Sequence, residues 1–246
     1  MHSYLLKTSL VFPAILALLL TAPVSSPAQS EEEMRILQLY YSDNDLVVTA
    51  TRSEKPISQV AENVTILTAD DIQAINAHTV ADVLNWVTGL QLANNIGPGS
   101  GSVVNIQGSA SRHVLVMIDG VVQNNLSDGF PDVGAMRVQQ VERIEIVQGP
   151  ASSSWGSSLG GVINVITKSP DDMRGFGGTI SASIGERATG DYRGEISGTS
   201  GSLGYYLSGG GLLTDGLQPN TSLRSGNVYS KLQWRPTEGS TLSWTL

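Results

Sequence analysis

The segment 156–160 reads GSSLG and matches G-x-S-x-G, the pattern that holds a nucleophilic serine on a sharp turn between a strand and a helix. Such a serine needs a histidine base, which in that fold follows it along the chain. Every histidine of this chain precedes Ser158 instead: His2, His78 and His113. The β-branched run 162–166 also predicts a strand where the motif requires a helix. We therefore expect no catalytic residue at this motif and no enzyme.

Two pairs of adjacent carboxylates, Asp70-Asp71 and Asp171-Asp172, are the other candidates for acid–base or metal chemistry. Neighbouring residues do not converge on one face of a helix, so neither pair forms a site by itself. The first pair suits the N-terminus of a helix and the second a solvated linker. The chain has no Cys, which excludes disulfides and thiolate metal sites. We expect neither a metal nor a cofactor.

Composition and the N-terminus indicate an acidic, exported protein. The 246 residues carry a formal net charge of −8 and no block of Lys or Arg, which argues against nucleic acid as a partner. Lys7, the apolar run 10–20 and the small residues 26–28 follow the order of a secretory signal peptide. The apolar run is shorter than the ~20 residues of a membrane-spanning helix. Residues 1–28 are therefore predicted to be a signal peptide.

The most informative stretch is 138–170, VQQVERIEIVQGPASSSWGSSLGGVINVITKSP. Two apolar runs of strand length, 141–147 and 162–166, flank a connector rich in Gly and Ser. The connector opens with Gly149-Pro150 and closes with Gly160-Gly161, which allows sharp turns and close packing at both ends. This pattern predicts two buried strands joined by a tight loop.

The same stretch resembles the end of the plug domain of TonB-dependent outer-membrane receptors, although Trp155 stands where that family often has Tyr and the connector is slightly shorter. The resemblance implies a receptor in the bacterial outer membrane that takes up a scarce small molecule, such as a siderophore or other iron chelate, or cobalamin. In such receptors the plug gates a barrel, and the TonB protein supplies the energy. The implied partners are TonB, outer-membrane lipid and the small-molecule ligand.

A short segment before the plug resembles the TonB box of the family. It is β-prone and too short to bury itself, so it suits addition as a strand to the sheet edge of a partner. The resemblance assigns TonB binding to six consecutive residues: Asp45, Leu46, Val47, Val48, Thr49 and Ala50.

Two short helices and several strands are predicted between this segment and residue 138. Thr68 with Asp71, and Thr79 with Asp82, each pair a polar N-cap with an acidic residue three positions on. Gly89 is expected to end the second helix. His78 lies between the helices and is interpreted as a linker or cap residue and not as a ligand. Strands are predicted at 64–67 and 112–121, and the segment 103–108 leads into the second of them, which ends in the turn Asp119-Gly120.

Two polar loops, 94–102 and 124–130, are the candidates for contact with the ligand, because the resemblance places them on the outer side of the plug. The first loop lacks the G-K-[ST] ending of a phosphate-binding loop. Both loops can equally be ordinary solvated turns. The candidate ligand-binding residues are Asn94, Asn95, Gly99, Ser100, Ser102, Asn124, Asn125 and Ser127.

From Gly175 the chain consists of short segments that alternate apolar with small polar residues, as in transmembrane β-strands. A half-buried soluble sheet has the same alternation. Aromatic residues that could form membrane-interface girdles are Tyr205, Tyr206, Trp234 and Trp244. The remaining 72 residues suffice for about four or five strands, whereas a plugged barrel has about 22. We therefore expect an N-terminal fragment or a truncated gene product.

The predicted fold is an α+β plug domain, a small mixed sheet with short helices, followed by the start of an antiparallel transmembrane β-barrel that is truncated. The expected divisions are the signal peptide, an N-terminal extension at 29–55 that contains the TonB box, the plug at 56–170 and the first barrel strands at 171–246. Two alternatives remain at this point: a soluble periplasmic binding or interaction module derived from a plug, and a non-functional truncated receptor.

Overall fold

The computed structural model describes residues 36, 46–50, 53–93, 101–151, 155–156, 158–170, 175–237 and 240–246. The predicted signal peptide, Asp45, the loop residues 94–100 and Asp171-Asp172 lie outside these ranges. Within them, no helix combines the length and apolar character that crossing a membrane requires.

The first part of the chain forms a five-stranded sheet, which we call the plug sheet. Its strand order is β3-β8-β9-β6-β7, with β6 parallel to β9 and the other neighbours antiparallel. The bounds are β3 Asn63–Thr68, β6 Val114–Ile118, β7 Val121–Val122, β8 Val141–Gln148 and β9 Gly161–Thr167. The predicted pair of buried strands around the Gly-rich connector is confirmed as β8 and β9.

Short elements complete the plug. The helices are α3 Ala69–Ala74 and α4 Val80–Leu84, and the 3-10 turns are Ile57–Gln59 and Ser111–His113. Two small hairpins pair β1 Leu46–Val47 with β2 Lys55–Pro56, and β4 Leu90–Ala93 with β5 Val103–Ile106. The side chains of Val80, Val83 and Leu84 are fully buried in the main apolar core, which joins α4 to the plug sheet.

Both predicted helix starts are confirmed as capping boxes. In α3 the hydroxyl of Thr68 accepts a hydrogen bond from the amide of Asp71, and the Asp71 carboxylate accepts from the Thr68 amide at 2.9 Å and its hydroxyl at 2.7 Å. Thr79 and Asp82 repeat the arrangement at α4. The expected end at Gly89 is wrong, because α4 ends at Leu84. Gly89 instead lies in the following turn with φ of 88°.

Replacing Thr68 with Ala is expected to lower the free energy of unfolding by about 1 kcal/mol, because the α3 amide loses its acceptor. The hydrogen bonds from the Thr68 amide and hydroxyl lower the pKa of Asp71 from 3.8. The stability linked to Asp71 is therefore present above pH 3.8 and is lost as the pH falls from there through the lowered pKa. Urea titrations of the parental protein and of Thr68→Ala, each at pH 7 and pH 3, measure the loss of stability and its dependence on pH. Equal stability of both proteins at pH 7 contradicts the prediction.

The turn Asp119-Gly120 joins β6 to β7 as predicted. Both residues have positive φ, 48° and 79°, which is the signature of a type I′ turn and suits Asp-Gly. The Asp119 carboxylate accepts hydrogen bonds from the amide and hydroxyl of Thr167, at the end of β9. The turn is therefore tied to the point where the chain leaves the plug sheet.

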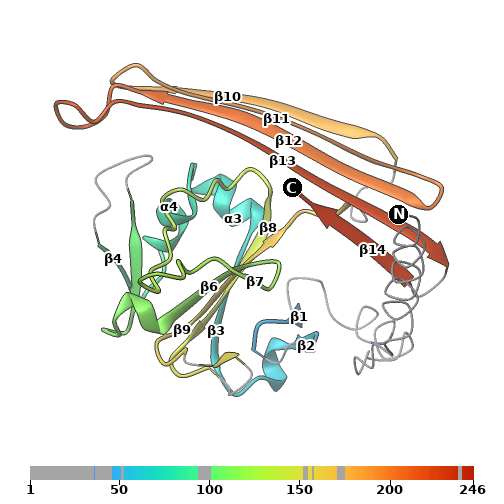
Figure 1. Cartoon of the computed structure of the whole chain (residues 1–246), viewed down its shortest axis with the longest axis horizontal. Coiled ribbons are helices and arrows are strands. Elements are labelled where there is room, and N and C mark those ends of the chain that lie inside the picture. Colours follow the sequence, from blue (N-terminus) through green and yellow to red (C-terminus); the bar gives the residue numbers. More distant parts are fainter. Residues whose placement is uncertain are drawn as a thin grey trace, which may run out of the picture.

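The second part of the chain is a five-stranded antiparallel meander, which we call the wall sheet. It comprises β10 Gly177–Gly185, β11 Thr189–Ser200, β12 Leu203–Thr214, β13 Leu223–Thr237 and β14 Ser240–Thr245, in chain order. The long strands β10 to β13 extend across the plug, and α3 and α4 lie on the plug side that faces them (Figure 1).

The two faces of the wall sheet have the polarity opposite to that of a soluble protein. Apolar side chains are exposed on the outer face, for example Ile180 at 91% and Val228 at 83%. The inner face presents polar groups to the plug, among them Asp191, Tyr229 and Gln233, all buried. This arrangement is expected of a sheet between lipid and a polar lumen, and a soluble half-buried sheet would have the opposite sidedness.

One expectation about the aromatic residues is wrong. Tyr206 does not lie on the outer face, because its side chain is fully buried, its hydroxyl donates to Glu195 at 2.6 Å and its ring makes a T-shaped contact with Tyr229. Trp234 and Trp244 are exposed at 43% and 56%, as a membrane-interface position requires.

Candidate functional site

The segment 46–50, assigned above to TonB binding, is docked against the plug. Leu46 and Val47 form β1, and the side chains of Val47 and Thr49 are fully buried. Two backbone amides, of Val48 and Thr49, donate to one carboxylate oxygen of Glu145 at 3.0 and 2.9 Å. The Thr49 hydroxyl donates to the same oxygen at 2.6 Å. The segment is therefore held through its backbone as well as its side chains.

Two plug residues, Glu145 and Trp155, hold the segment 46–50 by hydrogen bonds, and the sequence did not predict this role for either. Glu145 lies in the middle of β8 and its side chain is fully buried. Its second carboxylate oxygen accepts a hydrogen bond from the Arg143 guanidinium at 2.9 Å. The indole of Trp155 donates to the carbonyl oxygen of Thr49 at 2.6 Å. An acidic residue inside an apolar strand run was the available signal, because a buried carboxylate needs partners.

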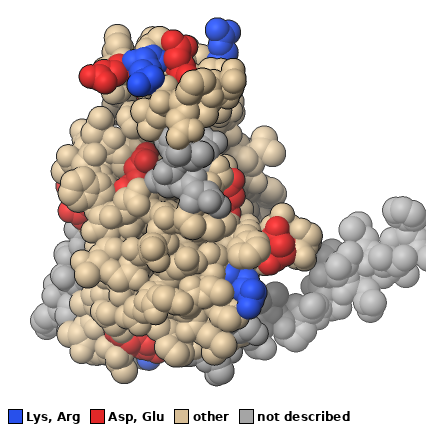
Figure 2. Space-filling view, turned by 90° about the vertical axis from the view of Figure 1, so that its left-hand side faces the viewer, with Lys and Arg blue, Asp and Glu red and all other residues tan. Residues whose placement is uncertain are grey.

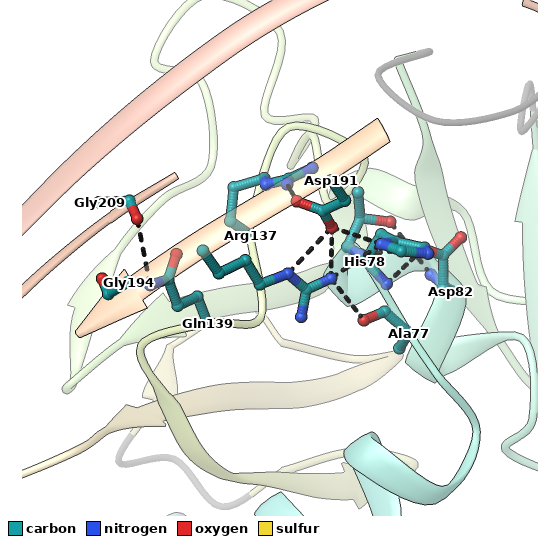
Figure 3. Close-up of polar contacts among 10 residues, drawn as sticks. Ala77, His78, Asp82, Arg137, Gln139, Asp191, Gly194 and Gly209 are labelled. Carbon is teal, nitrogen blue, oxygen red and sulfur yellow. Dashed lines mark hydrogen bonds and ion pairs between the residues drawn. The ribbon is translucent and has the colours of Figure 1, made fainter. Parts of the chain in front are cut away.

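A second polar centre joins the plug to the wall sheet around Asp191 of β11 (Figure 3). His78 Nδ1 lies 2.5 Å from one Asp191 oxygen, and Arg137 donates to the other at 2.7 Å. Arg193, on the same strand, also contacts Asp191 and reaches the Ala77 carbonyl at 3.2 Å. We call these four residues the Asp191 cluster: His78, Arg137, Asp191 and Arg193.

The cationic partners in the cluster offset the cost of burying the Asp191 carboxylate. Asp191 is only 1% exposed, so an unpaired carboxylate there would be strongly unfavourable. Burial lowers the pKa of Arg137, and the neighbouring Asp191 carboxylate counteracts that effect. His78 is more than the linker residue expected from the sequence, since its ring reaches a strand 113 positions away. No group of three or more potential metal ligands occurs in the part of the chain that the structure describes.

Further contacts extend the joint between plug and wall. Gln139 donates to the carbonyl of Gly194 at 2.7 Å, and Lys168 pairs with Glu195 at 2.7 Å. At the other edge, Lys231 lies 3.2 Å from Asp119. A cavity of about 300 Å³, lined by both polar and apolar side chains, lies between α3, the start of β8 and strands β10 and β11. Polar groups around this space fix the plug to the wall sheet.

The candidate ligand-binding residues do not share one environment in the structure. Ser102 is 1% exposed, and its amide donates to Asp132 at 3.0 Å. The Asn124 side chain is bonded to the backbone of β6 and to the Gly129 carbonyl, so it holds its own loop. Asn125 and Ser127 are exposed, and the Asn125 oxygen accepts from the Ser127 amide at 2.9 Å. Asn94, Asn95, Gly99 and Ser100 lie outside the described residues.

The GSSLG motif lacks the surroundings of a hydrolase. Strand β9 begins at Gly161, so the predicted strand follows Ser158 in place of the helix that the motif requires. The Ser158 hydroxyl is buried and has no hydrogen-bond partner among the described residues. Gly160, which ends the motif, instead packs closely against Ser109 and the His113 carbonyl, and Gly161 after it packs against the Val147 carbonyl of β8.

Comparison with known proteins agrees with this geometry. Residues 56–162 match the family described as TonB-dependent Receptor Plug Domain. The chain is 32% identical to the vitamin B12 transporter BtuB of Photobacterium profundum, over 73% of this chain and 31% of that protein. It is 37% identical to BtuB of Vibrio cholerae serotype O1, over 63% of this chain and 25% of that protein. The chain therefore spans less than a third of the length of these relatives.

The fold also matches a solved receptor. The ferripyoverdine receptor of the outer membrane of Pseudomonas aeruginosa, bound to ferripyoverdine, superposes with a TM-score of 0.67. Sequence identity is 16%, and the match covers 80% of this chain and 26% of that one. The match includes the combination of a plug with strands that resemble the start of a barrel. The family consists of receptors and transporters and not of enzymes. Residues 56–162 belong to it as a plug domain of the TonB-dependent receptors.

Proposed function

We propose that this chain is the N-terminal part of an outer-membrane receptor for energised uptake of a scarce ligand. Residues 1–28 direct export, 29–55 carry the TonB contact, 56–170 form the plug and 171–246 begin the barrel wall. TonB binds residues 45–50 and pulls, and the plug rearranges to let the ligand pass inward. The chain performs no bond chemistry in this role.

The observation that carries the proposal is the sidedness of the wall sheet. Its outer face exposes Ile180, Ile184 and Val228, and its inner face bonds the plug through Asp191 and Lys231. A soluble plug-like module would expose this apolar surface to water, which is unfavourable and promotes association. Residues 29–246 are therefore expected to require lipid or detergent, and a monomer soluble without either would favour the periplasmic module.

Cobalamin is the ligand we propose first, with an iron chelate as the second choice. The relatives named above are vitamin B12 transporters, and both exceed 30% identity over most of this chain. Acidic and basic groups occur together at the top of the face seen in Figure 2, and most of that face carries neither. The described candidate contacts Asn125 and Ser127 are exposed and uncharged, which suits a ligand held mainly by polar and apolar contacts. Exposed Asn125 and Ser127, with the loop 94–102, are the proposed contacts.

Deleting residues 45–50 from the full-length protein is expected to abolish energised uptake and leave ligand binding at the cell surface intact. The physical reason is that strand addition by TonB needs the backbone of this segment. Uptake and surface binding of radiolabelled cobalamin in cells that lack their own receptor measure the two effects.

The matched control deletes another six residues, 217–222, which are exposed in the turn between β12 and β13 and lie outside the proposed contacts. Uptake that survives the deletion refutes the coupling role. Loss of surface binding together with uptake would mean that the deletion disrupts the plug. Uptake of a ferric chelate without uptake of cobalamin would mean that the ligand is an iron chelate, and the receptor role would stay in place.

A further inference from the structure

The outer face of the wall sheet contains a patch that lacks side chains. Alternate residues of a strand point to the same face, and Ile196, Leu207 and Val228 mark the outer face because they are exposed. Four neighbouring positions of that face are glycines: Gly194 of β11, Gly209 and Gly211 of β12, and Gly226 of β13. Gly194 pairs with Gly209, and Gly211 pairs with Gly226. The glycine patch therefore crosses three adjacent strands.

The wall sheet itself does not require glycine at these four positions. None of them has the left-handed φ that favours glycine. A Cβ atom added at any of them would meet no atom closer than 3.6 Å, whereas one at Gly161 would lie 2.3 Å from a carbonyl oxygen. Glycine in a strand interior weakens the strand and often marks a place where another molecule approaches closely. The glycine patch thus leaves room on the outside of the protein.

Larger side chains turn part of the patch into a groove of about 340 Å³ with an almost entirely apolar lining. Its floor is formed by Gly194 and Gly209, and its walls by Ile180, Ile196 and Leu207. A groove that faces lipid loses dispersion contacts wherever it stays empty. A hydrocarbon chain fills an apolar groove without leaving a polar atom unpaired.

Arg224 places a cation at one end of the same face. Its side chain is exposed, and it forms no ion pair within the ranges that the structure describes. The ten positions from Arg224 to Trp234 along β13 correspond to about 33 Å of strand, or about 25 Å along the membrane normal at the usual tilt. That is the height of the apolar band of an outer-membrane barrel. With Trp234 at one membrane interface, Arg224 lies at the other, at the level of lipid phosphates.

Tyr192 links the groove to this interface. It pairs with Gly211 of the glycine patch, and its side chain is 50% exposed. Its ring leans over Gly190, where an added Cβ would lie 3.0 Å from a ring carbon and 3.1 Å from the hydroxyl oxygen. Gly190 and Arg224 lie in one row across the sheet, because both pair with Leu213. The ring therefore extends the apolar surface, and the hydroxyl points to the level of Arg224, as Tyr does at membrane interfaces.

We propose that this groove binds one acyl chain of a phosphate-bearing membrane lipid, with the lipid phosphate paired to Arg224. Val228, which pairs with Gly209 at the groove, is four positions from Arg224, or about 13 Å of strand. An acyl chain that starts at the headgroup level of Arg224 therefore reaches the groove. Lipid tails are all apolar, so hydrophobicity alone selects no lipid. The groove selects the chain by its shape, and Arg224 selects the charge of the headgroup.

Native mass spectrometry of the full-length protein in detergent, titrated with dimyristoyl phosphatidylglycerol, tests the proposal. The parental protein is expected to retain one lipid. Gly194→Leu is expected to abolish retention, because it fills the groove at a position where an added Cβ meets no atom within 4 Å. Leu207→Ala, which removes one wall, should lower retention.

The headgroup contact is tested separately. Arg224→Gln is expected to lower retention of phosphatidylglycerol about fivefold, the equivalent of ~1 kcal/mol for one basic residue at an anionic membrane surface. The same substitution should leave retention of dimyristoylglycerol unchanged, because that lipid has no phosphate. Equal loss of both lipids would overturn the assignment of Arg224.

Two matched controls accompany these variants. Leu242→Ala removes the same side-chain volume from the outer face at β14, where Leu242 is exposed. Arg187→Gln removes the same charge from the exposed turn before β11. Both controls should retain the lipid as the parental protein does. Equal loss in Arg187→Gln and Arg224→Gln, or parental retention in Gly194→Leu, would overturn the proposal. A dimer that Gly194→Leu dissociates would also overturn it, because a second copy of the chain would then occupy the groove.

The proposal rests on the proposed placement of the outer face of the wall sheet in the membrane. The measurement involves neither TonB nor cobalamin, so its failure is distinguishable from failure of the receptor function. Uptake lost on deletion of residues 45–50, together with lipid retention that no substitution changes, would keep the receptor role and remove the lipid site. Lipid retention that follows the expected order, together with uptake that survives the deletion, would keep the lipid site and remove the coupling role.

Discussion

Replacing Asp191 with Ala is expected to loosen the plug from the wall sheet, with a loss of about 3–5 kcal/mol of local stability. The substitution removes the one carboxylate that faces His78, Arg137 and Arg193 within the cluster. Two guanidinium groups would then lie together with no anion between them, at a position where Asp191 is 1% exposed. Unpaired buried charge is among the few mechanisms that reach this magnitude.

Hydrogen exchange of the full-length protein in detergent, followed by mass spectrometry, measures the loss. Peptides that cover the α3–α4 linker and residues 132–140 should exchange faster, because local opening there needs the cluster to break. Asp191→Asn should have a smaller effect, since the amide keeps one acceptor. Glu186→Ala, at an exposed turn of the same sheet, is the control. Unchanged exchange in Asp191→Ala would show that the other plug–wall contacts suffice.

Gly161→Ala is expected to be the second most damaging change, with a loss of at least about 3 kcal/mol from overpacking and backbone strain together. A Cβ atom at Gly161 would lie 2.3 Å from the Val147 carbonyl oxygen and 3.0 Å from the Ile106 side chain. The φ angle of 140° is also one that L side chains rarely adopt. The carbonyl belongs to β8, the neighbouring strand, so it cannot move without disturbing the pairing of β8 and β9.

A urea titration of the full-length protein in detergent, followed by hydrogen exchange of peptides from β8 and β9, reports the stability of this region. Gly149→Ala separates strain from clash, because Gly149 has φ of 99° but an added Cβ would meet no atom within 4 Å. We expect it to cost about 1–2 kcal/mol. If both substitutions cost the same, the clash with Val147 is relieved by local movement and the prediction for Gly161 is wrong.

Much of the fold is local in origin and was therefore predictable. Alternation with a period of two predicted β10, β13 and β14 of the wall sheet, and the Thr-x-x-Asp spacing predicted both helix starts, because these signals depend on a few neighbouring residues. The helix end at Leu84 was missed, since Val87 continues the apolar spacing but is buried from a turn and not from the helix. Side-chain spacing alone cannot distinguish these two cases.

The sequence by itself determined the family, the strands around the Gly-rich connector and the reason that Ser158 is no catalytic nucleophile. Only the tertiary structure decided that Tyr206 faces the plug, that His78 meets Asp191 and that Glu145 holds segment 46–50. The last two contacts join residues 113 and 96 positions apart. Contacts at such separations depend on how whole sheets pack, and the pattern of neighbouring residues does not encode which buried carboxylate meets which donor.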